Sequence, residues 1–270
     1  MTTLNELPPL AAATAAARPP MQSEDDWFKP CAVVPVYNHE RSLPAVVAAL
    51  HAADLPCVLV DDGSSSAAAA VIAKLAEPAG VFLLRHERNQ GKGGAVISGL
   101  REARRLGFSH ALQVDADGQH DLSGVELFLD RASQAPDALI CGYPHYDSSV
   151  PKGRLYARYL THVWVWINTL SLSIRDSMCG FRVYPLEPTL ALIDSVRLGR
   201  RMDFDTEILV RLHWQQQPML WLPTRVHYPA DGISHFRLWL DNALISAMHA
   251  RLFFGMLLRA PKLLARRLQR

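Results

Sequence analysis

Two aspartates one residue apart end a short apolar segment of the chain, where residues 110–120 read HALQVDADGQH. Along an extended strand the side chains of residues i and i+2 point the same way, so Asp115 and Asp117 can reach one cation together. Carboxylate oxygens suit Mg²⁺ or Mn²⁺, ions that hold phosphate oxygens in sites of this kind. The alternative is an Asp-Gly turn formed by Asp117 and Gly118, with Asp115 in solvent. The pair by itself leaves both interpretations open.

The composition indicates a folded protein with a substantial core. The chain has 270 residues, 49% of them hydrophobic, and can form one large domain or two small ones. Its net charge of +2 is too small to indicate nucleic-acid binding, so no nucleic-acid partner is expected. The four cysteines form no CxxC pair and show no disulfide spacing, which fits a reducing, cytoplasmic compartment.

The two ends of the chain differ from its middle. Residues 1–28 lack a basic start and a long leucine-rich stretch, so we expect a flexible leader and not a signal peptide. The most apolar late stretch, 243–258, contains His249 and Arg251 and is shorter than the roughly 20 residues that a spanning helix needs. We therefore predict no transmembrane helix.

Short apolar segments alternate with helical patterns, and polar or glycine residues follow each apolar segment. This order predicts a largely parallel sheet with helices on both faces, whose polar clusters lie at the carboxyl edge where ligands bind. The expected strands are 31–36, 57–60, 81–84 and 111–114, and the expected helices are 42–53, 67–76, 94–106 and 122–133, the last with Asp121 as N-cap. Further on we expect a strand at 138–143, an aromatic helix at 155–172, a loop at 175–184, a helix at 204–215, a strand at 219–228 and a helical segment at 236–268 broken by Pro261.

Two further polar clusters belong to this predicted edge. Asp61 and Asp62 end a buried strand, where carboxylates are costly unless a ligand or a donor meets them. Gly63 and Ser64 also allow an Asx turn at the same place. Residues 89–95, NQGKGGA, form a flexible cationic loop that opens a helix, where free N–H groups can bind an anion or a base edge.

This glycine loop matches neither common nucleotide-binding motif. A phosphate loop requires a glycine where His86 stands and a serine or threonine where Gly93 stands. The dinucleotide fingerprint fails because its last position is Val96.

Taken together, the motifs resemble those of the family 2 glycosyltransferases, and most closely the dolichyl-phosphate mannosyltransferase-like branch, which uses polyprenyl-phosphate acceptors. The matching stretches, in the order of the family, are VPVYN (34–38), VDDGS (60–64), NQGKGGA (89–95), DADGQH (115–120), DSMCGFR (176–182) and FDTE (204–207). The resemblance implies an α/β GT-A fold with a mostly parallel central sheet flanked by helices and with C-terminal amphipathic helices. It places the catalytic domain at 29–235 and a basic amphipathic helical segment at 236–270.

By this resemblance the chain binds a UDP- or GDP-sugar together with Mg²⁺ or Mn²⁺ and inverts the anomeric carbon. A divalent ion there would neutralise the charge that grows on the leaving nucleoside diphosphate. The implied donor contacts are Pro35, Tyr37, Asn38, Asp61, Asp62, Gly91, Lys92, Asp115 and Ala116, and the implied metal ligands are Asp115, Asp117 and Gln119.

The acceptor half departs from the pattern of the branch. Arg175 and Arg182 flank the loop that by resemblance faces the acceptor, where a guanidinium can grip a phosphate. The branch often has a serine where Cys179 stands. It also has an arginine before a Gly-x-Ser-Lys segment, for which this chain has residues 228–235, YPADGISH. The acceptor is therefore expected to be lipid-linked, with its reacting group left open.

Asp205 and Glu207 complete the predicted catalytic set with the two arginines. They lie at i and i+2 near the start of a predicted helix and so do not share one helical face. If the acceptor is a hydroxyl, a carboxylate takes its proton and Asp205 is the expected base, whereas a phosphate acceptor needs no base. The alternative is that both carboxylates charge a helix N-terminus.

The segment 236–270 combines apolar side chains with cations. It has no acidic residue after Asp241, and after position 250 it carries Arg251, Arg259, Lys262, Arg266, Arg267 and Arg270. A basic amphipathic helix can lie in a membrane interface, where each cation contributes on the order of 1 kcal/mol against an anionic leaflet. The alternative is a helix packed on the domain or on a partner.

We therefore expect a peripheral enzyme on the cytoplasmic face of the inner membrane that moves a sugar to a lipid-like acceptor. The alternatives are a non-catalytic binding or scaffold protein of the same fold, and a hydroxyl-acceptor glycosyltransferase of a lipid or pigment pathway. A sugar nucleotidyltransferase is disfavoured, because residues 36–39 contain no glycine-rich activation loop. No pattern predicts the sugar, the nucleotide base or the oligomeric state.

Overall fold

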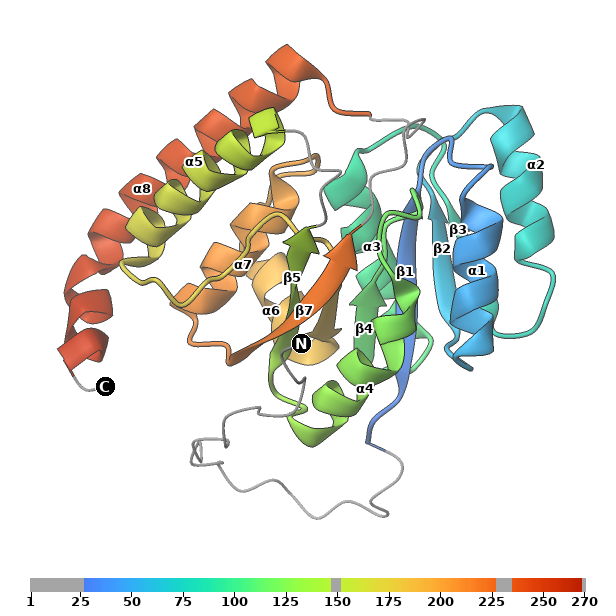
Figure 1. Ribbon diagram of the computed structural model, residues 1–270, viewed down its shortest axis with the longest axis horizontal. Coiled ribbons are helices and arrows are strands. Elements are labelled where there is room, and N and C mark those ends of the chain that lie inside the picture. Colours follow the sequence, from blue (N-terminus) through green and yellow to red (C-terminus); the bar gives the residue numbers. More distant parts are fainter. Residues whose placement is uncertain (1–26, 147–151, 227–234, 269–270) are drawn as a thin grey trace.

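The computed structural model describes residues 27–146, 152–226 and 235–268, which form a seven-stranded sheet with helices on both faces (Figure 1). The strand order is β3-β2-β1-β4-β6-β5-β7. The strands are β1 (Pro30–Val36), β2 (Cys57–Asp61), β3 (Val81–Arg85), β4 (His110–Gln113), β5 (Leu139–Tyr146), β6 (Arg182–Pro185) and β7 (Met219–Val226). The helices are α1 (Leu43–Ala52), α2 (Ser66–Leu75), α3 (Lys92–Arg105), α4 (Val125–Gln134), α5 (Lys152–Thr169), α6 (Leu186–Ser195), α7 (Phe204–Trp214) and α8 (Leu238–Leu268). The predicted leader at 1–28 lies outside the described residues, except for Trp27 and Phe28.

The first half of the sheet is parallel, which confirms the prediction from alternating strands and helices. β1 pairs in parallel with β2 and with β4, and β2 pairs in parallel with β3. Every residue of β2 is buried, as expected for a parallel strand covered on both faces. Asp121 caps the short turn before α4 by accepting the N–H of Ser123 at 3.0 Å. The carboxyl ends of β1, β2 and β4 therefore meet at one edge of the sheet.

α3 lies very close to the strands because a glycine faces them. A Cβ on Gly99 would overlap Val33 and lie 3.0 Å from Val60 Cγ2. No larger residue fits between the helix and the sheet without moving one of them. This close approach fixes the N-terminus of α3, and with it Lys92, at the carboxyl edge.

The segment predicted as a loop at 175–184 is only partly a loop, because Arg182 begins strand β6. This strand runs antiparallel to β4 and β5, with Gln113 opposite Arg182. An arginine and a proline hide the apolar pattern of a strand, so the sequence pattern predicts neither β6 nor the helix α6 that follows it. Arg182 is nevertheless fully buried, since its guanidinium donates to the backbone carbonyls of Ser177 and Asp205.

α8 continues through Pro261, and the prediction of a break at this residue was wrong. Proline removes one helical hydrogen bond and crowds the preceding turn. Met256 and Leu263 are buried on either side of it, so packing holds both halves of the helix on the domain. Among the described residues, Leu238–Arg266 is the one stretch long and apolar enough to cross a membrane, judged by length and composition only. That length corrects the expectation that the apolar stretch is too short.

Two hydrophobic clusters fill the two sides of the sheet. One joins α3, α6, α7 and α8 through residues such as Leu100 and Ile208. The other joins α1 and α4 through residues such as Leu50 and Phe128. α5 and α8 lie side by side as a pair of long helices (Figure 1). The sheet is thus a packed platform that fixes the loops at its carboxyl edge.

Candidate active site

The acidic loop after β4 is folded as a turn and presents both carboxylates at the edge of the sheet. Asp117 accepts the N–H of Gln119 at 3.0 Å, and Gly118 has a positive φ of 72°. Ser42 donates its hydroxyl to the carbonyl of Ala116 at 2.6 Å, which fixes the loop against the start of α1. The turn and the carboxylate pair therefore coexist, and the two interpretations of the sequence do not exclude each other.

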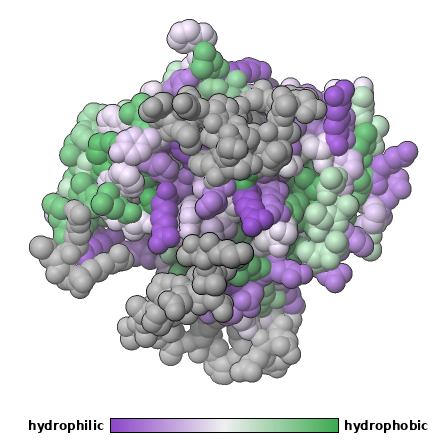
Figure 2. Space-filling model, viewed as in Figure 1, coloured by the Kyte–Doolittle hydropathy of each residue, from purple (hydrophilic) through white to green (hydrophobic). Residues whose placement is uncertain are grey.

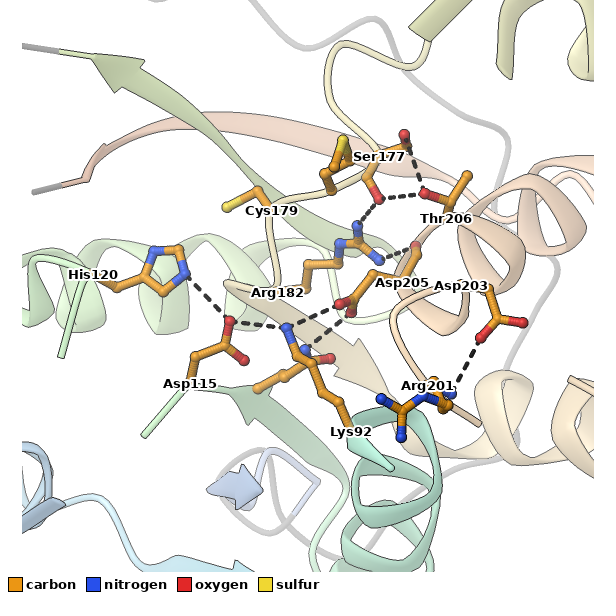
Figure 3. A network of polar contacts seen from close by, with 12 residues as sticks. Lys92, Asp115, His120, Ser177, Cys179, Arg182, Arg201, Asp203, Asp205 and Thr206 are labelled. Carbon is orange, nitrogen blue, oxygen red and sulfur yellow. Dashed lines mark hydrogen bonds and ion pairs between the residues drawn. The ribbon is translucent and has the colours of Figure 1, made fainter. Parts of the chain in front are cut away.

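Lys92 lies between two carboxylates that come from different parts of the chain (Figure 3). Its Nζ is 2.9 Å from Asp115 Oδ2 and 2.9 Å from Asp205 Oδ2. Burial disfavours the charged ammonium, but the two carboxylates raise the pKa of Lys92 above its ordinary value. A Cβ on Gly180 would lie 3.0 Å from this Nζ, so a larger residue there would have to shift the ion pair or the loop that covers it. The geometry makes Lys92 a fixed cation at the centre of the site.

The remaining carboxylate oxygens fit a divalent cation. Asp115 Oδ1 is buried and has no hydrogen-bond partner among the described residues. Burial raises the pKa of Asp117, and the neighbouring Asp115 raises it further. Burial also favours the neutral form of Asp115, but Lys92 and His120 hold its pKa below the ordinary value. A cation bound between Asp115 Oδ1 and Asp117 would give the first a partner and would offset the repulsion between the two carboxylates.

Within the described ranges no group of three or more His, Cys, Asp or Glu side chains forms a metal site. Asp115 and Asp117 would thus hold an ion with only two carboxylates. This suits Mg²⁺ or Mn²⁺, which bind through one or two carboxylates together with water and substrate phosphates. Gln119, the third predicted ligand, lies in the same turn through its N–H bond to Asp117.

Asp205 is buried, and protein donors hold both of its oxygens. Gln113 Nε2 donates to its Oδ1 at 3.0 Å, while Lys92 contacts its Oδ2. Arg182 lies beneath it and donates to the Asp205 carbonyl at 2.7 Å and to the Ser177 carbonyl at 2.8 Å. Arg182 has no exposed surface, and its bonds hold the backbone beneath the site. Its contact with an acceptor stays a prediction.

Glu207 lies on another side of α7 and does not contact Lys92 or the acidic loop. Its carboxylate accepts the N–H of Gly199 at 2.8 Å, two bonds from Arg211 at 2.8 and 3.0 Å, and one from Arg251 at 3.2 Å. The separation of Asp205 and Glu207 agrees with their i, i+2 spacing. Glu207 therefore joins α7 to α8 and to the segment before α7.

Asp61 and Asp62 are both buried and bonded to the protein. Asp62 accepts the N–H groups of Gln90 at 2.8 Å and Gly91 at 2.9 Å, and it contacts His86 Nδ1 at 2.7 Å. Asp62 thereby holds the glycine loop in shape.

Asp61 instead closes the turn after β2. It accepts the N–H of Ser64, three residues on, at 2.9 Å, and Nε of Arg85 at 2.9 Å. An Asx turn would use the N–H two residues on, so the bond differs from the predicted one. Asn38 has a positive φ of 54° and accepts the N–H of Ser65 at 2.8 Å. The loops after β1 and β2 are therefore linked.

The other predicted contacts lie around the mouth of this edge. Pro35 is half-buried in β1, and the ring of Tyr37 lies 5.0 Å from the ring of His235. Arg175 is exposed, with its guanidinium 5.4 Å from the centre of the Tyr143 ring. The residues 228–234 of the departing segment lie outside the described residues, which leaves His235 as its described end.

Several residues that lie around the site were not predicted as site residues, although His120 and Asp176 fall inside the matched stretches DADGQH and DSMCGFR. Gln113 and His120 flank the acidic pair, with His120 Nε2 3.9 Å from Asp115 Oδ2. Arg200 and Arg201 contact the glycine loop although they lie much later in the sequence, Arg200 being 110 residues after Gln90. Asp176 accepts two bonds from Arg158, both at 2.6 Å, and the N–H of Cys179 at 2.7 Å. The pairs Gln113–Asp205 and Arg158–Asp176 and the contacts of Arg200 join separate segments of the chain, so no local spacing predicts them.

The architecture is that of the GT-A fold, as comparison with solved structures shows. Glucosyl-3-phosphoglycerate synthase from Mycobacterium tuberculosis, solved with Mn²⁺ and UDP-glucose, superposes with a TM-score of 0.63. The match covers 88% of this chain and 84% of that chain at 12% sequence identity, so it bears on the fold alone. The class that the comparison defines is therefore the GT-A fold, with two carboxylates at the end of β4.

Among proteins with this fold, the chain belongs to glycosyl transferase family 2, whose model matches residues 31–194. The dolichyl-phosphate beta-glucosyltransferase of Mus musculus is 30% identical over 211 residues, which cover 69% of this chain and 64% of the relative. A Methanococcus voltae enzyme, UDP-N-acetylglucosamine--dolichyl-phosphate N-acetylglucosaminyltransferase, is 34% identical over 195 residues, or 66% of this chain and 77% of the relative. The chain thus spans less than two thirds of the mouse protein. The resemblance seen in the motifs is confirmed.

Replacing Asp176 with asparagine tests the ion pair between Arg158 and Asp176. Burial favours the neutral acid, but bonds from His162, Arg158 and the Cys179 N–H hold the pKa of Asp176 below its ordinary value. Asp176→Asn leaves Arg158 without its buried partner, so the free energy of unfolding should fall by about 3 kcal/mol near neutral pH.

The pH dependence has a definite sign. Because the folded-state pKa lies below the unfolded value of about 3.9, the carboxylate stabilises the fold above about pH 4 and loses that effect as pH falls further. In urea unfolding, the difference in the free energy of unfolding between wild type and Asp176→Asn should stay constant down to about pH 5. It should be smaller at about pH 3. A difference that grows in acid would contradict the assignment.

Proposed function

We propose that the chain transfers a sugar from a UDP- or GDP-sugar to the phosphate of a lipid-linked acceptor, with inversion and with Mg²⁺ or Mn²⁺. The observation that carries this proposal is the pair Asp115 and Asp117, with its unpartnered oxygen and its mutual repulsion. The names of the relatives, which act on dolichyl phosphate, support the same class of acceptor. Residues 29–235 are the proposed catalytic domain.

In this proposal the donor lies between the loops after β1 and β4 and the glycine loop. Asp62 holds the amides of the glycine loop in place, and the N-terminus of α3 favours the negative diphosphate. Lys92 is the cation closest to the acidic pair and can bind diphosphate oxygens as a point charge. Pro35, Tyr37 and Asn38 are proposed to contact the nucleoside. A bound Mg²⁺ or Mn²⁺ would neutralise the charge that grows on the leaving diphosphate.

The geometry around Asp205 favours a phosphate acceptor over a hydroxyl. Gln113 and Lys92 already contact both oxygens of Asp205, so a hydroxyl acceptor would have to approach one of the lone pairs that remain on this buried carboxylate. A phosphate oxygen is already anionic and can attack the anomeric carbon directly. The bond from that carbon to the donor phosphate then breaks, and the nucleoside diphosphate leaves with the electron pair. Arg175, exposed at the mouth, is the arginine proposed to contact the acceptor.

The outer sides of α5 and α8 are proposed to lie on a membrane. Figure 2 shows hydrophobic side chains gathered on the side of the molecule where Figure 1 places these helices. The exposed large hydrophobic residues there are Tyr159, Leu160, Trp164, Ile167, Leu172, Leu238, Trp239, Leu240, Phe254, Leu257, Leu258 and Leu264. Exposed Arg259 and Lys262 on α8 add charge that favours an anionic leaflet.

A position within the membrane interface suits α8 better than a spanning one. Its inner side, with Met248, Leu252 and Met256, is buried in the core of the domain. A helix fixed in this way cannot be surrounded by lipid without losing that packing. The proposed location is therefore the cytoplasmic face of the inner membrane, with the protein bound peripherally.

Metal binding is tested by thermal unfolding with Mn²⁺ and UDP or GDP. A ligand at about 100 times its Kd stabilises the fold by about 2.7 kcal/mol, which for a chain of this size raises Tm by roughly 5 °C or more. Asp117→Asn should lose most of this shift, and EDTA should remove it from wild type. Asp54→Asn is the control, because Asp54 is exposed, has a positive φ that asparagine tolerates, and lies far from the acidic loop. A full shift in Asp117→Asn would overturn the metal assignment.

The acceptor is tested with labelled UDP- and GDP-sugars and two lipids that differ only in the phosphate. We expect label in lipid with polyprenyl phosphate and divalent metal, and none with the matching polyprenol. The product should release its sugar in mild acid, because a glycosyl phosphate is acid-labile. Transfer to the free alcohol would instead establish the hydroxyl-acceptor alternative.

Membrane binding is tested by flotation with phosphatidylglycerol-containing vesicles. Trp239 is 86% exposed and Leu258 is 84% exposed, so serine at either position should not disturb the core. Each substitution should lower partitioning about tenfold or more, given roughly 1.5–3 kcal/mol for burying such a side chain. Leu127→Ser, on the exposed face of α4, is the matched control and should have no effect. Equal partitioning of all three variants would contradict the proposal.

A further inference from the structure

The glycine loop has a neighbour from a distant part of the sequence, the 196–203 segment between α6 and α7. Gly94 donates its N–H to the carbonyl of Arg200 at 2.9 Å. A Cβ on Gly91 would lie 2.5 Å from that carbonyl oxygen, and a Cβ on Gly93 would lie 2.9 Å from the Gly199 carbonyl oxygen. Arg200 also donates to the side chain of Gln90 at 3.0 Å. Consecutive residues of the glycine loop therefore rest directly on the backbone of the 196–203 segment.

On its other side, α8 holds the 196–203 segment through an ion pair. Arg201 donates to the two oxygens of Asp241 at 2.7 and 3.3 Å. Asp241 has no exposed surface, and it also accepts the N–H of Arg237 at 2.6 Å in the first turn of the helix. The Cγ of the same Arg201 would lie 2.8 Å from a Cβ on Gly91. One side chain thus contacts both the glycine loop and α8.

A second connection runs through Glu207. This buried carboxylate accepts the N–H of Gly199 from the 196–203 segment and a bond from Arg251 of α8. α8 is therefore bonded to the 196–203 segment directly through Asp241 and indirectly through Glu207 of α7. The glycine loop is bonded to Asp62 on one side and to the 196–203 segment on the other.

We infer that Arg201 and Asp241 are positioning residues, whose ion pair lets α8 hold the 196–203 segment against the glycine loop in the shape needed to bind a nucleotide. The residues touch no donor themselves and act through Gly91 and Gly94. Without the pair, the glycine loop samples open shapes and binds with an affinity reduced by the fraction of time it is closed.

Hydrogen exchange in the nucleotide-free protein tests this directly. Asp241→Asn should raise exchange of the amides at 89–95 about tenfold and leave the amides of β2 and β3 unchanged. Asp194→Asn is the matched control, because it breaks an ion pair of similar length, Arg101 to Asp194 at 2.6 Å, on the exposed surface of α3 and α6. Unchanged exchange at 89–95, or an equal rise throughout the domain, would overturn the inference.

Arg201→Gln is the second variant, to be used if Asp241→Asn does not fold. Arg201 is 21% exposed and lies in a loop, so its replacement disturbs the core less than a change at the buried Asp241. Arg201→Lys keeps the positive charge but cannot donate to both oxygens of Asp241 in the same way. Its amide exchange at 89–95 should therefore lie between those of wild type and Arg201→Gln.

Nucleotide affinity gives an independent readout that rests on the proposed function. The Kd for UDP or GDP with Mn²⁺ should rise about tenfold in Asp241→Asn, and kcat at saturating donor should stay near that of wild type. A lower kcat with unchanged Kd would contradict a positioning role. If wild type binds neither nucleotide, the proposed function fails, while the exchange experiment still decides the inference.

Discussion

The site is organised around one cation, Lys92, that lies between two carboxylates. Its Nζ is 2.9 Å from both Asp115 and Asp205, and its charge holds the pKa of Asp115 below the ordinary value although burial acts in the other direction. Gly180 lets the loop before β6 lie against this ammonium, since a Cβ there would be 3.0 Å from Lys92 Nζ, and Gly99 lets α3, which begins at Lys92, pack closely on β1 and β2. The buried Arg182 then fixes the backbone of Asp205 from below.

α8 serves the domain in two directions at once. Its inner side contributes core residues and the carboxylate of Asp241, and its outer side carries Trp239 and Leu258 in solvent. Helices that only anchor a protein to lipid have no need of buried charges, and helices that only fill a core have no need of exposed tryptophan. The combination joins the segment beside the glycine loop and the exposed apolar side of α8 in one packed unit.

The parallel half of the fold could be predicted because each strand, its polar end and the next helix are neighbours in sequence. The acidic pair and the glycine loop were found for the same reason. β6 could not be predicted, because it begins with Arg182 and charged residues are usually exposed. This arginine is buried because its guanidinium donates to the carbonyls of Ser177 and Asp205. Pro261 failed as a helix end because tertiary packing outweighed a local preference. The i, i+2 spacing predicted that Glu207 and Asp205 lie on different sides of the helix, as they do. The partners of Glu207, Gly199 and Arg251, lie in other parts of the chain, so no local pattern predicts them.

The antiparallel insertion of β6 between β4 and β5 has a consequence for how the chain acquires its site. Gln113 and Asp205 are 92 residues apart, and they meet only when β6 and α7 have docked beside β4. Closing so long a loop is entropically costly, and contacts of high order form late in folding. During synthesis, β1 to β4 with Lys92 and Asp115 emerge before Asp205. The carboxyl edge of the sheet can therefore be complete only after α7 has left the ribosome, when Lys92 gains its second carboxylate.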